Sequence, residues 1–142
     1  MNAEALLDSN ILVYAYDQTE GKKCLQARTI LESAWEGKKR FAISTQNLAE
    51  FYVIVTKKIE RPIPKKEAAI SVQHMATSLN FTILAPDKEC LIRAMNLSEQ
   101  NNIPFWDAHI IAVALKHGVR TILTENIKDF KAPGLRAVNP FE

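Results

Sequence analysis

The hydrophobic residues of the chain fall into two patterns that alternate along its length. Short, mainly apolar runs that are typical of buried strands occur at 5–7, 41–43, 81–85 and 119–123, with a further candidate at 135–138. Longer stretches with helical spacing occur at 11–16, 22–35, 44 or 45 to about 58, 65 to about 79, 88 to about 100, and 105–116. Strands that alternate with helices predict an α/β fold with a parallel sheet of four or five strands, covered on both faces.

Several residues mark where these elements begin and end. Ser44 or Thr45 is placed to cap the third helix, and Pro62 forces the chain out of helical conformation just beyond it. Pro64 has the fixed backbone angle that suits the start of the next helix. Gly118 stands where the last helix needs a residue with a left-handed backbone. The predicted boundaries are therefore supported by local chemistry as well as by periodicity.

Composition limits the class of protein. A chain of 142 residues with 47% hydrophobic and 24% charged residues is the size of one domain, and we expect residues 1–142 to form a single unit. The net charge of +2 is too small to reveal a nucleic-acid partner by itself. No apolar run is long enough for a signal peptide or a membrane span. Cys24 and Cys90 lie far apart, which predicts reduced core thiols and a cytoplasmic location.

An acidic residue directly follows the first predicted strand. In an open parallel sheet, ligands bind beyond the carboxyl ends of the strands, where the chain enters the helices. Asp8 takes this position, two residues before Asn10. The alternative is that Asp8 is only the N-cap of the next helix, a role that aspartate fills well.

Glu50 interrupts an apolar stretch in the third predicted helix. Residues 48–49 and 51–55 around it are almost all apolar. A buried carboxylate without a partner costs several kcal/mol, so Glu50 must be solvated, paired or bound to a metal. The simpler interpretation is an exposed stripe shared with Gln46, Asn47 and Lys57.

Asp107 is a second acid among apolar residues, in the first turn of the helix at 105–116. The helix dipole alone would favour an acid there by up to about 1 kcal/mol. That interpretation does not explain why tryptophan and isoleucine surround it. The loop at 124–129, at the carboxyl end of the strand at 119–123, adds a hydroxyl, an amide and two acids, of which Glu125 is expected to be a solvated surface residue.

The joint placement of these acids indicates a cation site. Carboxylates that converge raise one another's pKa unless a cation neutralises them. Oxygen ligands of this kind suit Mg²⁺ or Mn²⁺, which also bind substrate phosphate.

A zinc site is not indicated. His74, His109 and His117 form no ligand pair, and neither cysteine has a close partner. His109 lies on roughly the opposite helix face from Asp107 and is expected to be a packing residue.

Four segments in order carry a family resemblance. They are Leu-Leu-Asp8-Ser-Asn10, Gln46-Asn47-Leu-Ala-Glu50-Phe, Pro-Phe-Trp-Asp107-Ala-His-Ile-Ile-Ala and Leu-Thr124-Glu-Asn126-x-x-Asp129-Phe. Together they resemble the PIN-domain nucleases, and most of all the toxin ribonucleases of VapBC-type toxin–antitoxin pairs. The resemblance implies a PIN-like three-layer α/β/α fold across the whole chain.

The resemblance also implies a function and a set of site residues. Asp8, Glu50 and Asp107 match the three principal acids, which would bind Mg²⁺ or Mn²⁺ and activate water against an RNA phosphodiester. Thr124 matches the hydroxyl of the last segment. Many relatives have a fourth acid two residues later, where this chain has Asn126, and Asp129 is the acid that could replace it.

Other functions compete with this one. Phosphatases with an aspartate nucleophile after the first strand usually carry a second aspartate two residues on, where this chain has Asn10. A P-loop nucleotide-binding site is excluded because no G-x-x-x-x-G-K-[ST] segment occurs. From a different class, the chain could be a non-catalytic PIN-like scaffold or a receiver-like domain with an acidic metal pocket.

Two further surfaces are expected from the sequence. A basic stretch with Lys57, Lys58 and Arg61 begins about two helical turns after Glu50 and is a candidate for binding RNA. Toxins of this kind are restrained by a small antitoxin protein, and Tyr52, Val53 and Ile59 with the helix from Lys65 could form its groove. The alternatives are a solvated helix end and plain core residues. A homodimer is also compatible with the sequence.

Overall fold

Five parallel strands form the centre of the protein in the computed structural model, which describes residues 3–142. They are β1 (Ala5–Leu7), β2 (Phe41–Ser44), β3 (Phe81–Leu84), β4 (Thr121–Leu123) and β5 (Arg136–Val138). Their order in the sheet is β3-β2-β1-β4-β5, and every neighbouring pair is parallel. Leu6 of β1 lies between Ala42 of β2 and Ile122 of β4, so the first strand occupies the middle of the sheet.

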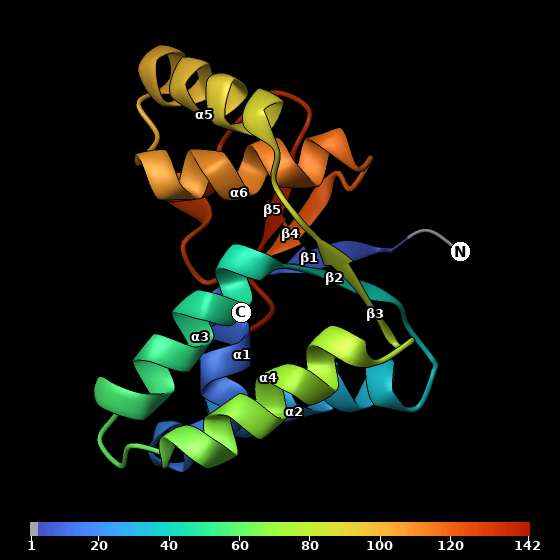
Figure 1. Cartoon of the computed structure of the whole chain (residues 1–142), viewed down its shortest axis with the longest axis vertical. Coiled ribbons are helices and arrows are strands. Elements are labelled where there is room, and N and C mark those ends of the chain that lie inside the picture. The colour runs from blue at the N-terminus through green and yellow to red at the C-terminus, as the bar shows by residue number, and fades with distance from the viewer. Residues whose placement is uncertain (1–2) are drawn as a thin grey trace.

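Helices cover both faces of this sheet (Figure 1). One layer holds α1 (Ser9–Tyr16), α2 (Lys22–Trp35), α3 (Thr45–Lys57) and α4 (Lys65–Thr77), and the other holds α5 (Lys88–Asn101) and α6 (Phe105–Lys116). Two short 3₁₀ helices, η1 (Gln18–Glu20) and η2 (Ile127–Phe130), complete the fold. The predicted three-layer α/β/α architecture is confirmed, with five strands.

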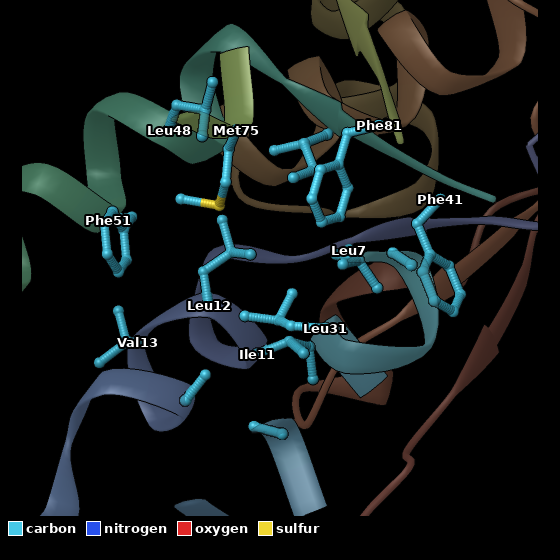
Figure 2. Close-up of a cluster of buried hydrophobic side chains, with 14 of the residues drawn as sticks. Leu7, Ile11, Leu12, Val13, Leu31, Phe41, Leu48, Phe51, Met75 and Phe81 are labelled. Atoms are coloured by element: carbon cyan, nitrogen blue, oxygen red, sulfur yellow. The ribbon is translucent and has the colours of Figure 1, made fainter. Parts of the chain in front are cut away.

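The side chains of β1 divide the core into two clusters because successive residues of a strand point to opposite faces. Leu7 packs among residues of α1 to α4, including Leu12, Phe51 and Met75 (Figure 2). Leu6 belongs to the other cluster, which is built largely from α5 and α6. A run that is apolar at every position is therefore what a central parallel strand requires.

Local hydrogen bonds set the ends of two elements differently from the prediction. α4 ends at Thr77 rather than near Leu79, because Asn80 turns the chain by donating its backbone N–H to Ser78 Oγ at 3.0 Å. Val119 does not begin β4: its N–H donates to the Ala114 carbonyl at 2.9 Å and closes α6 around Gly118, whose φ is +74°. The strand consequently starts at Thr121.

The connection order reverses between β1 and β4, and we call the region beyond the carboxyl ends of these two strands the crevice. From β1 the chain proceeds to β2 and β3 on one side, and only afterwards to β4 and β5 on the other side. The helices after β1 and β4 therefore diverge beyond the carboxyl ends of these strands, which is where open α/β sheets bind their ligands. Within residues 3–142, no helix combines the length and apolar character needed to cross a membrane.

Candidate active site

Asp8 lies at the carboxyl end of β1 and is the most buried of the predicted site acids. Its backbone N–H donates to the Leu123 carbonyl at 3.0 Å, which fixes it against the end of β4. Its Oδ1 accepts the Ser9 N–H at 2.8 Å and caps α1, and the residue is 5% exposed. Asp8 is thus an N-cap, as the simpler interpretation held, and it also faces the crevice.

Polar side chains from three other segments converge on the Asp8 carboxylate. Thr124 donates its hydroxyl to Oδ2 at 2.8 Å, and both residues are buried. Asn47 donates its amide to Oδ1 and Asn10 donates to Oδ2, both at the longer distance of 3.4 Å. Burial is the largest influence on the Asp8 carboxyl and raises its pKa, although hydrogen bonds from the Thr124 hydroxyl and the Ser9 N–H oppose the effect.

Asn47 was not predicted as a site residue, yet it is fully buried beside Asp8. It forms a capping box with Ser44, in which each side chain bonds the backbone N–H of the other residue. The interpretation of Asn47 as part of an exposed stripe is therefore wrong. The Ser-x-x-Asn spacing at the start of α3 was the signal that could have found it.

Glu50 projects toward the same crevice from the second turn of α3. Its Oε1 accepts the Ser9 hydroxyl at 3.0 Å, and its Oε2 accepts the Gln46 amide at 3.2 Å. Ser9 also lies 3.4 Å from Asp8 Oδ1, so one hydroxyl joins the two acids. These contacts place Glu50 in the site and not on a plain solvent stripe.

Asp107 completes the acidic group from the first turn of α6. Desolvation and the charges of Asp8, Asp129 and Glu50 together raise the pKa of Asp107 to about 6. Four carboxylates from four segments thus act on one another electrostatically. Asp129 belongs to η2, where its N–H is bonded to the Asn126 carbonyl at 3.0 Å.

The donor set fits a hard divalent cation. Asn10 Oδ1 is buried and lacks a hydrogen-bond partner among residues 3–142, beside Asp8 and Thr124. An unpaired buried acceptor and mutually repelling carboxylates are both relieved by a cation with oxygen ligands. The acids are not drawn into a tight ligand cluster, since no group of three metal-binding side chains close enough to hold an ion occurs in the described part of the chain.

Gln46 connects the acids to α6. Its Nε2 donates to Glu50 and to the Trp106 carbonyl at 3.1 Å, so its Oε1 accepts from Nδ1 of His109 at 2.9 Å. His109 packs on Phe105 as expected, with ring centroids 5.9 Å apart, but it also belongs to the wall of the site. Burial lowers the pKa of His109.

Glu125 is held in place and is not a freely solvated loop residue. The Tyr14 hydroxyl donates to its Oε1 at 2.5 Å, and Lys23 forms an ion pair with it. Burial alone would raise the pKa of Glu125, but these hydrogen bonds and the lysine charge keep it below its ordinary value. Burial and the Glu125 contact raise the pKa of Tyr14 to about 12. The three residues tie the loop after Thr124 to α1 and α2.

The remaining candidates lie outside this group. Asn126 is exposed, and its backbone N–H bonds Thr124 Oγ1 at 3.0 Å. Lys57 and Lys58 are exposed at the carboxyl end of α3, while Glu50 is near its beginning. Arg61 lines a separate hollow of about 360 Å³ together with Asp17.

Comparison with known proteins assigns the family. The sequence model of the PIN domain matches residues 5–134, and the chain belongs to the PIN domain family. No curated protein shows a significant sequence match to the chain.

Solved structures share this fold over nearly the whole chain. A chain of a toxin–antitoxin complex from Klebsiella pneumoniae is 26% identical, with 97% of this chain and 98% of that chain covered and a TM-score of 0.65. VapBC2 from Rickettsia felis, bound to a promoter DNA fragment, gives 23% identity, coverages of 95% and 97%, and a TM-score of 0.65. VapC20 from Mycobacterium tuberculosis, a toxin that cleaves the sarcin–ricin loop, gives 14% identity, coverages of 83% and 86%, and a TM-score of 0.64.

Proposed function

We propose that the protein is a Mg²⁺- or Mn²⁺-dependent endoribonuclease and the toxin of a VapBC-type toxin–antitoxin pair acting in the cytoplasm. The observation that carries this proposal is the acidic group at the crevice between β1 and β4. Burial of Asp107 and the charges of Asp8, Asp129 and Glu50 together raise the pKa of Asp107 to about 6. Membership of the PIN domain family and the toxins among the similar structures support the same conclusion.

Each residue has a distinct role in this proposal. Asp8, Glu50 and Asp107 would hold the cation, with Asp129 and the unpaired Asn10 Oδ1 beside them. The bound cation would supply Lewis acidity and an activated water for attack on the phosphodiester. Thr124 and Asn47 fix the Asp8 carboxylate through their hydrogen bonds, and Ser9 fixes its position relative to Glu50.

The test is cleavage of single-stranded RNA with and without divalent cation. We expect cleavage with Mn²⁺ or Mg²⁺, none in EDTA, and loss of cleavage in Asp8→Asn and Asp107→Asn with the fold retained. Glu4→Gln is a matched control, because Glu4 is an exposed acid at the amino end of β1. Full activity in both site variants together with EDTA-insensitive cleavage would overturn the proposal.

The same preparation separates the non-catalytic alternatives. A receiver-like domain would incorporate acid-labile phosphate on Asp8 and leave RNA intact, whereas a scaffold would do neither. A nuclease would be stabilised by added Mn²⁺ and would cleave the RNA. A cation that binds only the folded state adds about 2.7 kcal/mol to the free energy of unfolding when its free concentration is 100 times its Kd.

We also propose that a small antitoxin protein covers an apolar groove between α3 and α4. Its lining includes Leu48, Tyr52, Val53 and Val72, and its volume is about 530 Å³. Val53 is 43% exposed, whereas Ile59 is 9% exposed and packs in the core, so only part of the predicted set faces the groove. An amphipathic helix is the segment that best fits such a groove.

A further inference from the structure

Trp106 is unusual in leaving most of its side chain in water. It is 62% exposed, although a tryptophan usually buries most of its large apolar surface. It also directly precedes Asp107, one of the proposed cation ligands. Packing in the core does not explain an exposed indole beside a proposed cation ligand. The surface around Trp106 suggests a role in binding.

Trp106 forms one wall of a hollow between the amino ends of α5 and α6, which we call the α5–α6 hollow. Its other walls include Pro86, Lys88, Leu91, Phe105 and His109, and its volume is about 390 Å³. Ring and aliphatic side chains dominate this surface. A flat, apolar ligand of modest size matches it better than a charged one does.

The aromatic side chains of the hollow are braced against one another. The Trp106 ring meets Phe105 edge to face, with centroids 5.0 Å apart, and meets His109 in the same way at 5.8 Å. The Trp106 carbonyl accepts the Gln46 amide, which also donates to Glu50. The hollow is therefore fixed relative to the acids by a single side chain, and a ligand in it would be held beside the proposed cation site.

Charge at the rim favours a phosphate-bearing ligand. Lys88 lines the hollow and makes no ion pair with any of the residues that the structure describes. Asp87 also lines the hollow, but its carboxylate forms an ion pair with Lys116. A cation is thus available to a phosphate group, while the neighbouring carboxylate is occupied.

We infer that the α5–α6 hollow receives an unpaired base of the RNA substrate, stacked on the Trp106 indole, next to the phosphate that is cleaved. The inference rests on the proposed nuclease function and adds a positioning residue to it. Proteins recognise single-stranded RNA largely by stacking splayed bases on aromatic side chains. Stacking here would place the adjacent phosphate toward the cation that Asp107 and Glu50 would hold.

A second copy of the chain is the competing occupant. Leu91, Ile92 and Met95 are about half exposed on α5, and an apolar surface of this kind can pair with itself. Ile92 and Met95, however, do not line the hollow. The hollow itself combines aromatic walls, a cationic rim and a link to Glu50 through Gln46, which fits a nucleotide better than a dimer partner.

Fluorescence reports the stacking directly, because the chain has only two tryptophans. In a Glu50→Gln, Trp35→Phe protein, Trp106 is the sole indole and cleavage is suppressed. Titration with a short single-stranded RNA should quench its emission, and the matching Trp106→Phe protein, which retains Trp35, should show no quenching. Binding without quenching of Trp106 would overturn the inference.

An independent energetic test combines variants of Trp106, in an otherwise unaltered enzyme, with RNA that carries an abasic site. Trp106→Ala should lower kcat/KM by about 5- to 150-fold, the equivalent of about 1–3 kcal/mol at 1.36 kcal/mol per factor of ten. Trp106→Phe should recover most of the loss. Removing the base that flanks the cut should lower the kcat/KM of the wild type by a similar factor and leave that of the Trp106→Ala enzyme almost unchanged. Trp35→Ala, at an exposed tryptophan on α2, is the matched control.

Three results would decide between the alternatives. Equal effects of the abasic site in wild type and Trp106→Ala would overturn the inference. So would conversion of a dimer to a monomer by Trp106→Ala, measured by light scattering, without an effect of the abasic site. If the wild type cleaves no RNA yet RNA quenches Trp106, the proposed cleavage fails and the base site stands.

Discussion

At the residue scale, Asp107 makes a testable contribution to stability. Its pKa is raised from 3.8 to about 6, so the folded state disfavours the charged carboxylate. The destabilisation is present above pH 6 and is relieved as the pH falls from about 6 to 4. Because the side chain is half-buried and solvent screens its interactions, we expect roughly 1 kcal/mol from this effect.

Thermal unfolding in EDTA checks this prediction. Asp107→Asn should exceed the wild type in Tm by about 2–4 °C at pH 7.5, since 1 kcal/mol has that effect in a domain of this size. The difference should shrink toward pH 4. Asp8 also has a raised pKa, but its largest cause is burial, which both proteins share, so that part cancels in the comparison. A difference that is constant with pH would contradict the electrostatic explanation.

Asp129 and Asn126 are the two candidates for the role that the fourth acid has in many relatives. The charge of Asp129 acts on Asp107, whereas the described contacts of Asn126 are through its backbone. We therefore expect Asp129→Ala to lower the rate of RNA cleavage far more than Asn126→Ala, with both Tm values close to that of the wild type. The reverse order would assign the positioning of water or substrate to Asn126.

At the element scale, the carboxyl end of α3 is the candidate for contact with the RNA backbone. Lys57, Lys58 and Arg61 are exposed there, and each phosphate contact on a single strand contributes about −0.7 to the slope of log K against log salt. Replacing all three with alanine should weaken RNA binding and flatten that slope by up to about 2 units.

The control removes the same charge, three basic side chains, from the amino ends of the strands. Lys38, Lys39 and Arg136 are exposed and lie near the amino ends of β2 and β5. Their replacement by alanine should leave the slope unchanged. If both triple variants behave alike, the basic stretch at the end of α3 is ordinary surface, where lysines also favour the helix dipole.

At the scale of the whole molecule, the α3–α4 groove predicts how the nuclease is restrained. Val53→Asp places a charge on an exposed wall of the groove and should abolish capture of the protein encoded by the adjacent gene in a co-expression pull-down. RNA cleavage should persist, because Val53 lines the α3–α4 groove, whose lining includes none of the site acids. Leu79→Asp, at a side chain 88% exposed beyond α4, is the control. A chain that binds no such protein and is harmless at high expression would contradict the toxin role.

The sequence by itself determined most of the elements and singled out the candidate acids. Most strands are short, mainly apolar runs and the helices have their own periodicity, so local physics suffices to locate them. Asp8 and Asp107 follow from the same information, because a residue just after a strand or early in the next helix must lie near the carboxyl edge of a parallel sheet. Glu50 could be identified because it is a charged residue among apolar neighbours.

Only the tertiary structure decided which polar side chains meet. The contact between Gln46 and His109 joins residues 63 positions apart, and the contact between Tyr14 and Glu125 joins residues 111 apart. The periodicity of a single helix assigns His109 to a packing face but does not specify what stands opposite it. Such contacts depend on how α3 and α6 are placed by the sheet between them, and the register of β1 against β2 and β4 fixes that placement.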